Sequence, residues 1–230
     1  MLPVLRTLER GSAAIQYVAC DFRRLADVAA GADEIARAAV GPIDGLINNA
    51  GVPGSPTREV TADGHERTLQ VNYFAMVLLT EHLMPALADH ARVVNVASAT
   101  HEMTRLGLPD LELERDYSAV RAYARSKLAV IMYTRWLAQH RNTRGITSVS
   151  LSPGVINTDL LLAMFGSIGD SVERGARNVI AALTTPARGG EYFDDGRLVE
   201  PSTQALRDEL IDELMAITFD ALAPHLPRPV

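Results

Sequence analysis

The stretch Ile43-Asp-Gly-Leu-Ile47, followed at once by Asn48-Asn-Ala-Gly51, predicts a short strand that ends in a tight polar turn. Two similar apolar runs, residues 92–97 and 146–151, lie further along the chain, and long segments of helical periodicity separate the three runs. Short apolar strands that alternate with helices are typical of a parallel sheet covered on both faces. The sequence therefore predicts an α/β fold with a doubly wound parallel sheet.

The other predicted elements extend this alternation toward both ends of the chain. The sequence contains no repeat, low-complexity tract or Pro/Gly-rich linker, so a single domain spanning residues 1–230 is the simplest division. Further strands are predicted at residues 15–20 and 191–193, and helices at residues 25–39, 61–87, 117–140, 171–183 and 203–222.

The composition argues against several classes of function. Lys and Arg number 22 and Asp and Glu number 28, which gives a net charge of −6. An acidic chain without a basic run is a poor candidate for binding nucleic acid or an anionic membrane. Cys20 is the single cysteine, the six histidines lack metal-site spacing, and no segment has the pattern of a membrane span or signal peptide. We therefore expect a cytoplasmic protein without a metal, a nucleic-acid partner or a membrane partner.

The run Tyr123-Ala-Arg-Ser-Lys127 lies in a predicted helix and pairs a phenol with an ammonium group. Residues four apart share one face of a helix, one turn above the other. At about 5 Å and an effective dielectric constant of about 20, the ammonium favours the phenolate by on the order of 3 kcal/mol, roughly two pKa units. We therefore expect the pKa of Tyr123 to be lowered toward the range in which it exchanges a proton with a substrate.

Polar residues follow the predicted strands at the points where the strands end. In open parallel sheets, ligands bind outside the carboxyl ends of the strands. This rule selects Asp21, the Asn48-Asn-Ala-Gly51 turn, Ser98 and the Ser152-Pro-Gly154 segment, all at one rim of the sheet. A hydroxyl at this rim, together with the phenol and the ammonium of the following helix, is suited to polarising a carbonyl group and giving it a proton.

These motifs resemble, in order, those of the short-chain dehydrogenase/reductase family, and the chain is similar to its retinol-dehydrogenase-like branch. The resemblance runs from residue 15 to the C-terminus and implies a Rossmann-like sheet. The long interval between Ser98 and Tyr123 and the Gly190-Glu-Tyr-Phe193 segment fit that branch. The matching landmarks are Asp21, Asn48-Asn-Ala-Gly51, Val71-Asn72, Val94-Asn-Val-Ala-Ser98, Tyr123 with Lys127, and Pro153-Gly154 with Thr158.

The resemblance implies an NAD- or NADP-dependent oxidoreductase that interconverts a carbonyl and a primary or secondary alcohol by hydride transfer. It assigns Tyr123 as general acid or base, and Lys127 as the residue that lowers its pKa and holds the nicotinamide ribose. It assigns Ser98 to the substrate oxygen and Asn72 to a water relay. Family members commonly form homo-oligomers, here through the helices at residues 61–87 and 117–140. The implied cofactor-binding residues are Asp21, Phe22, Asn49, Ala50, Gly51, Tyr123, Lys127, Pro153, Gly154, Val155 and Thr158.

Several residues have a second interpretation that the sequence leaves open. On position alone, the hydroxyl of Ser126 is as good a candidate for the catalytic hydroxyl as that of Ser98. His101 would line the substrate mouth or serve as an ordinary loop residue, and we favour the loop. Thr158 would contact the cofactor amide or cap the next helix. The apolar residues after Thr158 suggest a lid over the substrate and are Leu160, Leu161, Leu162, Met164 and Phe165.

One landmark of the family has no counterpart in the sequence. A dinucleotide site needs a Gly-rich turn that lets the backbone approach the pyrophosphate, yet no two glycines in this chain lie two positions apart. Residues 2–10 instead resemble the helix that precedes the family's third strand. The first βαβ unit is therefore missing, the sheet is expected to be truncated on its N-terminal side, and the strand at residues 43–47 becomes a sheet edge.

Two hypotheses for the function follow. The retained Asn72, Ser98, Tyr123 and Lys127 favour an NAD(P)-dependent oxidoreductase, because a decayed enzyme could lose these side chains at little cost to folding. The missing phosphate turn favours a catalytically inactive relative that acts as an interaction or binding module. For the strand at residues 15–20, three arrangements stay open: it pairs with the strand at residues 43–47, another chain fills the gap, or the sequence begins late in its gene.

Overall fold

The computed structural model describes residues 15–141, 144–166 and 168–227. At its centre is a five-stranded sheet with the strand order β1-β2-β3-β4-β5. The first four strands are parallel, and β5 is antiparallel to β4. The predicted α/β fold with a mainly parallel sheet is confirmed. The strands are β1 (Ile43–Asn48), β2 (Leu87–Val96), β3 (Thr147–Ser152), β4 (Tyr192–Asp194) and β5 (Arg197–Val199).

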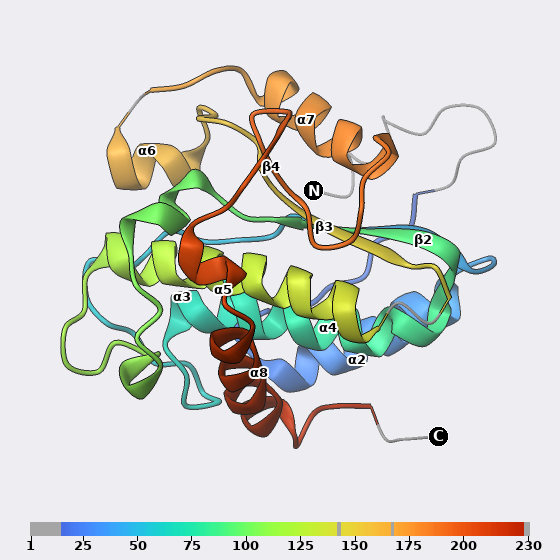
Figure 1. Ribbon diagram of the computed structural model, residues 1–230. Helices are drawn as coiled ribbons and strands as arrows, with labels where there is room; N and C mark the ends of the chain where they lie inside the picture. Colours follow the sequence, from blue (N-terminus) through green and yellow to red (C-terminus); the bar gives the residue numbers. More distant parts are fainter. Residues whose placement is uncertain (1–14, 142–143, 167, 228–230) are drawn as a thin grey trace.

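Helices cover both faces of the sheet (Figure 1). α7 (Val172–Thr184) lies on one face, above the strands in Figure 1. None of the described helices is both long enough and apolar enough to cross a membrane. On the opposite face lie α2 (Leu25–Ala38), α3 (Arg67–Leu69), α4 (Ala75–Leu83) and α5 (Ala119–His140), and α8 (Asp208–Leu222) packs against α5.

Residues 15–20 form no strand, which corrects the sequence prediction. A strand of a sheet needs a neighbour that pairs with its backbone groups, and the described sheet runs from β1 to β5 without residues 15–20. The segment instead lies against α2, where a Cβ on Gly31 would come within 3.2 Å of the Cys20 side chain. The expected open edge at β1 is therefore present among the described strands. The helix expected at residues 2–10 lies outside the described residues.

The helix predicted at residues 61–87 begins six residues late, at Arg67. The carboxylate of Glu66 stops it from starting earlier, because it caps the first turn by accepting hydrogen bonds from two backbone N–H groups at 2.9 and 2.7 Å. The helix then passes through a π-helical segment, Gln70–Phe74, before α4. This insertion changes which side chains face the core, a feature that helical periodicity does not predict.

The remaining predicted elements lie within a few residues of their expected bounds, with two exceptions. β2 begins at Leu87, five residues before the predicted strand, because the preceding helix ends in a 3₁₀ turn at Met84–Ala86. The helix predicted at residues 203–222 is divided at Arg207 into a 3₁₀ turn, Thr203–Leu206, and α8.

A ladder of buried amides and hydroxyls joins β1 and β2 to two helices. Nδ2 of Asn48 donates hydrogen bonds to Oδ1 of Asn95 at 2.8 Å and to the hydroxyl of Thr80 in α4 at 2.9 Å. Nδ2 of Asn95 donates in turn to the hydroxyl of Thr134 in α5 at 2.9 Å. Because buried polar groups need such partners in place of water, the ladder holds the carboxyl ends of β1 and β2 in register with α5.

We predict that Asn95→Ala lowers the free energy of unfolding by about 2–4 kcal/mol, because two buried polar partners lose their bonds. Urea denaturation measures this change. Ser150 is the matched control, since it lies beside Asn95 in the register of β2 and β3, and its buried hydroxyl has no hydrogen-bond partner among the described residues. Ser150→Ala should change the stability by less than about 1 kcal/mol. Equal losses in the two variants would contradict the role of the ladder.

Candidate active site

A cavity of about 370 Å³ opens at the carboxyl ends of β1, β2 and β3. This is the rim that the position of the strand ends predicts. No group of three metal-ligating side chains gathers here or elsewhere in the described residues. Three side chains expected in catalysis, Ser98, Tyr123 and Lys127, line the cavity together. The residues expected to bind the cofactor that also line it are Asn49, Ala50, Gly51, Pro153, Gly154 and Thr158.

α5 carries the phenol and the amine into this cavity. The hydroxyl of Ser118 caps the helix by accepting a hydrogen bond from the backbone N–H of Arg121 at 3.3 Å. The four-residue spacing places Nζ of Lys127 5.7 Å from the ring centroid of Tyr123. Nζ also donates a hydrogen bond to the carbonyl oxygen of Val96, at the end of β2, at 2.7 Å. The amine is thereby held between the helix and the end of the strand.

Burial dominates the protonation of both side chains. It lowers the pKa of the Lys127 amine to about 8. It also raises the pKa of the Tyr123 phenol, while a hydrogen bond with the Ser98 hydroxyl lowers it. The expected fall in the pKa of Tyr123 is therefore wrong for this structure, because loss of solvation outweighs the hydrogen bond with Ser98. No Asp or Glu is among the described residues that line the cavity, so no carboxylate there compensates the buried ammonium.

Asn72 lies behind the cavity and braces its wall. Its Oδ1 accepts a hydrogen bond from the N–H of Val52 at 2.7 Å, and its Nδ2 donates to the Val52 carbonyl oxygen and to the Ser126 hydroxyl, both at 3.0 Å. Ser126 is fully buried and also donates to the carbonyl oxygen of Tyr123 at 2.7 Å. Its hydroxyl therefore has a structural role, which leaves Ser98 as the better of the two candidate hydroxyls.

Two glycines let the backbone approach the cavity closely. A Cβ on Gly51 would lie 3.3 Å from Oδ1 of Asn72 and 3.5 Å from the amine of the cavity. Gly154 has a φ of +94°, in the left-handed region that favours glycine. The carbonyl oxygen of the preceding Pro153 accepts a hydrogen bond from Nδ2 of Asn178, in α7, at 2.9 Å. α7 thus holds the segment that follows β3 over the cavity.

α6 (Asp159–Phe165) supplies the apolar wall. The hydroxyl of Thr158 caps this helix by accepting the N–H of Leu161 at 3.3 Å, and the same residue lines the cavity. The position of Thr158 therefore fits both predicted roles, as the cap of this helix and as a contact to the cofactor amide. Of the five apolar residues expected in a lid, Leu160, Leu161 and Phe165 line the cavity, and Leu162 and Met164 are not among its described lining residues.

Three residues expected to contact the cofactor are not among the described lining residues. Asp21 is exposed, and its carboxylate accepts the N–H of Arg23 at 2.9 Å. Phe22 packs against the main apolar core. Val155 is exposed, and its carbonyl oxygen accepts the N–H of Asp170 at 2.8 Å. The prediction for Asp21 depended on a strand ending at residue 20, and without that strand the residue has no place at the carboxyl rim of the sheet.

His101 supports the strand end at Ser98, a role that the sequence does not reveal. Its Nδ1 donates to the carbonyl oxygen of Ser98 at 2.9 Å, and its Nε2 accepts the N–H of Ser202 at 3.0 Å. The ring is fully buried against Tyr192, with the centroids 5.1 Å apart. Burial lowers the pKa of His101, which keeps the ring neutral and this pair of bonds intact. No local pattern signals the contact, because Ser202 lies 101 residues further along the chain.

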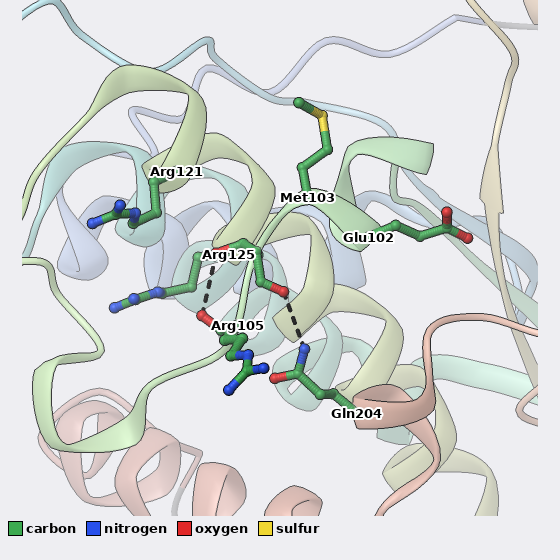
Figure 2. Close-up of a pocket in the computed structure, with 7 residues that line it drawn as sticks. Glu102, Met103, Arg105, Arg121, Arg125 and Gln204 are labelled. Carbon is green, nitrogen blue, oxygen red and sulfur yellow. Dashed lines mark hydrogen bonds between the residues drawn. The ribbon is translucent and has the colours of Figure 1, made fainter.

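A second hollow, of about 530 Å³, shows how the long segment between Ser98 and Tyr123 is anchored (Figure 2). Arg125 projects from α5 and donates hydrogen bonds to two backbone carbonyl oxygens of the segment. Gln204, from the C-terminal part of the chain, donates to the carbonyl oxygen of Thr104 at 3.0 Å and accepts the N–H of Leu106 at 3.1 Å. None of the residues expected in catalysis lines this hollow. Arg125 and Gln204 therefore hold the segment in place.

The geometry described above agrees with comparisons to known proteins. The profile of the short chain dehydrogenase family matches residues 2–165. The chain belongs to this family. Human retinol dehydrogenase 12 is 34% identical to it over 191 residues, which cover 77% of this chain and 60% of that protein. The retinol-dehydrogenase-like branch is thereby confirmed, and the chain spans about 60% of the length of this relative.

Solved structures support the same fold. An uncharacterised protein from Mycobacterium paratuberculosis is 28% identical and superposes with a TM-score of 0.75, covering 92% of this chain and 76% of that one. A blue fluorescent protein from a metagenomic library, solved in complex with NADPH, is 29% identical with a TM-score of 0.58 and covers 76% of this chain and 72% of that one.

We predict that the amine of Lys127 titrates near pH 8 in the folded protein. Lys127 is the only lysine in the sequence, so protein labelled with ¹³C at lysine Cε gives one resonance that reports on this amine alone. The same resonance should titrate at about 10.4 in the urea-unfolded chain. A folded midpoint of 10 or above would contradict the account of its burial.

The lowered pKa also predicts how stability depends on pH. Between the folded and the unfolded pKa, the unfolded chain binds more protons, so the free energy of unfolding should rise as the pH increases from about 8 to about 9.5, by at most about 1.4 kcal/mol per unit. Urea denaturation across this range measures the slope. Lys127→Met should remove the contribution of this amine to the slope. An unchanged slope in that variant would mean that other groups cause the pH dependence.

Proposed function

We propose that this protein is an NAD(P)-dependent oxidoreductase that reduces an apolar aldehyde or ketone to the alcohol, with Tyr123 as the general acid. The observation that carries the proposal is one cavity in which Ser98, Tyr123 and Lys127 meet the turn at residues 49–51 and the segment at Pro153. The family to which the chain belongs supports the same reaction class.

The cavity suits one half of a nicotinamide dinucleotide. Lys127 and Asn49 offer donors for a ribose and an amide, and Gly51 leaves a space that a Cβ would narrow. When bound, the nicotinamide would supply or accept the hydride. For the pyrophosphate half, the sequence contains no Gly-x-Gly turn. We therefore propose that Asn49, Gly51, Lys127, Pro153, Gly154 and Thr158 hold the nicotinamide and its ribose, and we propose no residues for the phosphates.

The protonation of Tyr123 favours reduction over oxidation. Burial raises the pKa of its phenol, so the proton stays on the oxygen at neutral pH and is available for a substrate carbonyl. The hydroxyl of Ser98 would donate a hydrogen bond to the same carbonyl oxygen and position it. Lys127 would hold the ribose and favour the phenolate that remains after proton transfer. In this scheme the chain supplies orientation and the proton.

An apolar substrate fits the wall of the cavity. Leu160, Leu161 and Phe165 of α6 face it, together with Ile156. Burial of such side chains against a hydrocarbon stabilises binding by about 25 cal/mol per Å² of apolar surface removed from water. The relative named retinol dehydrogenase supports an apolar alcohol or aldehyde as the substrate class.

A second candidate function is that of a catalytically inactive interaction module. One observation favours it: β1 is an edge strand among the described strands and lies beside an apolar hollow on the side of α7, where Ile47, Val172 and Ile180 are exposed. Open strand edges and exposed apolar patches are typical of surfaces that bind another chain.

We also propose a cytoplasmic homo-oligomer without nucleic-acid or membrane partners. The net charge of −6 argues against those two kinds of partner, and members of the family commonly form homo-oligomers. The two long helices expected at its interface are poorly placed for that role. The described residues of α4 are mostly buried, as is the central part of α5, and α2 and α8 pack against them. The interface would therefore lie elsewhere, and sedimentation equilibrium would test for the oligomer.

We predict that Tyr123→Phe lowers the rate of NADH- or NADPH-dependent reduction of retinal or decanal by about 10²- to 10⁴-fold, because the general acid is lost while the ring is kept. Loss of nicotinamide absorbance measures the rate. Tyr117→Phe is the matched control, since the Tyr117 hydroxyl donates to the carbonyl oxygen of Ser55 at 3.0 Å, outside the cavity lining. Its rate should stay within a few-fold of the unchanged protein. Equal rates for Tyr123→Phe and the unchanged protein would refute the assignment, and a folded protein with no turnover would favour the interaction module.

A further inference from the structure

The amine of Lys127 has the surroundings of a nucleophile as well as those of a cation. It lines a cavity open to small molecules, and its one described hydrogen bond runs to the carbonyl oxygen of Val96 at 2.7 Å. A carbonyl oxygen is a neutral acceptor, whereas a carboxylate would add a negative charge that holds the amine in its charged form. Desolvated lysines in apolar pockets are the lysines that react with carbonyl groups in enzymes.

The lining residues leave this amine without a counter-ion. Tyr123 is the only other titratable side chain among the described residues that line the cavity. With a pKa of about 8, roughly a tenth of the amine is neutral at pH 7, against roughly 0.04% for an ordinary lysine. The burial that disfavours the ammonium therefore provides a free amine at neutral pH.

Two hydroxyl groups line the cavity together with the amine, and an apolar wall bounds the same space. The phenol of Tyr123 stays protonated because burial raises its pKa, and the hydroxyl of Ser98 interacts with it. Leu160, Leu161 and Phe165 line the cavity and suit a hydrocarbon chain. An aldehyde that places its chain against this wall would bring its carbonyl group to the polar side of the cavity.

We propose that Lys127 captures apolar aldehydes covalently, as an imine, when no nicotinamide cofactor occupies the cavity. The Nζ lone pair forms a bond to the carbonyl carbon, and the carbonyl oxygen takes a proton from Tyr123, which gives a carbinolamine. One Nζ proton returns to the Tyr123 phenolate, the second leaves with the hydroxyl as water, and a carbon–nitrogen double bond forms. The amine and the aldehyde thus give the imine and one water, with no oxidant or reductant involved.

The test is reductive trapping of the unchanged protein. It is incubated with decanal and cyanoborohydride at pH 7 without any nicotinamide nucleotide, and the adduct is located by peptide mass spectrometry after cleavage with a protease that does not cut at lysine. Because Lys127 is the only lysine, the N-terminal amine is the only other primary amine, and the peptide map separates the two. The proposal expects the adduct on the peptide that contains residue 127.

Arg197→Lys supplies an internal reference, because residue 197 is exposed on β5 and lies outside the cavity lining. The proposal expects the adduct to form at least tenfold faster on Lys127 than at residue 197 of the same molecule. The fraction of neutral amine at pH 7 differs between the two positions by roughly two hundredfold, which sets the upper limit of this difference. Lys127→Arg should abolish the cavity adduct. Adducts confined to the N-terminal amine, or formed equally fast at the two lysines, would overturn the proposal.

These assays test imine capture and hydride transfer separately. Trapping is measured without a nicotinamide nucleotide, and turnover is measured without cyanoborohydride. An adduct without turnover would support the capture and count against the proposed oxidoreductase, whereas turnover without an adduct at residue 127 would do the reverse.

Discussion

The hydrogen-bonded ladder inside the sheet is the constraint on which the geometry of the cavity depends. Asn48 ends β1 immediately before the turn that lines the cavity. Asn95 is on β2, three residues before Ser98. Thr134, in α5, closes the ladder two helical turns after Lys127. A slip of β1 against β2 would leave these buried amides without partners, at a cost of about 1–3 kcal/mol for each unsatisfied group. The turn, the strand end and the helix therefore meet at the rim in one arrangement.

Within that arrangement, desolvation governs the chemistry of the cavity. A pairwise view of charges predicts an ammonium that favours a phenolate. In the folded chain, burial acts on both groups and favours the neutral amine of Lys127 and the neutral phenol of Tyr123. A protonated phenol suits proton donation to a carbonyl group, and a neutral amine suits attack on one. The same loss of solvation thus underlies both the proposed reduction and the proposed imine.

The sequence predicts the parts of the site that depend on local spacing. The pairing of Tyr123 with Lys127 follows from the repeat of an α-helix, and the position of the strand ends follows from the parallel sheet. Asp21 could not be placed in the same way, because its position required residues 15–20 to form a strand, and they form none. The contact between His101 and Ser202 joins segments 101 residues apart and leaves no local pattern. The direction of the Tyr123 pKa also escapes sequence reasoning, since it depends on how completely the fold buries the ring.

The central claim is that the cavity binds a nicotinamide dinucleotide even though the chain has no Gly-x-Gly turn. The most direct measurement is calorimetric titration of the folded protein with NADH and, separately, with NADPH. We expect a dissociation constant on the order of micromolar for one of the two, which corresponds to a binding free energy of about −8 kcal/mol. No heat of binding with either nucleotide at millimolar concentration, in a protein shown to be folded, would contradict the claim.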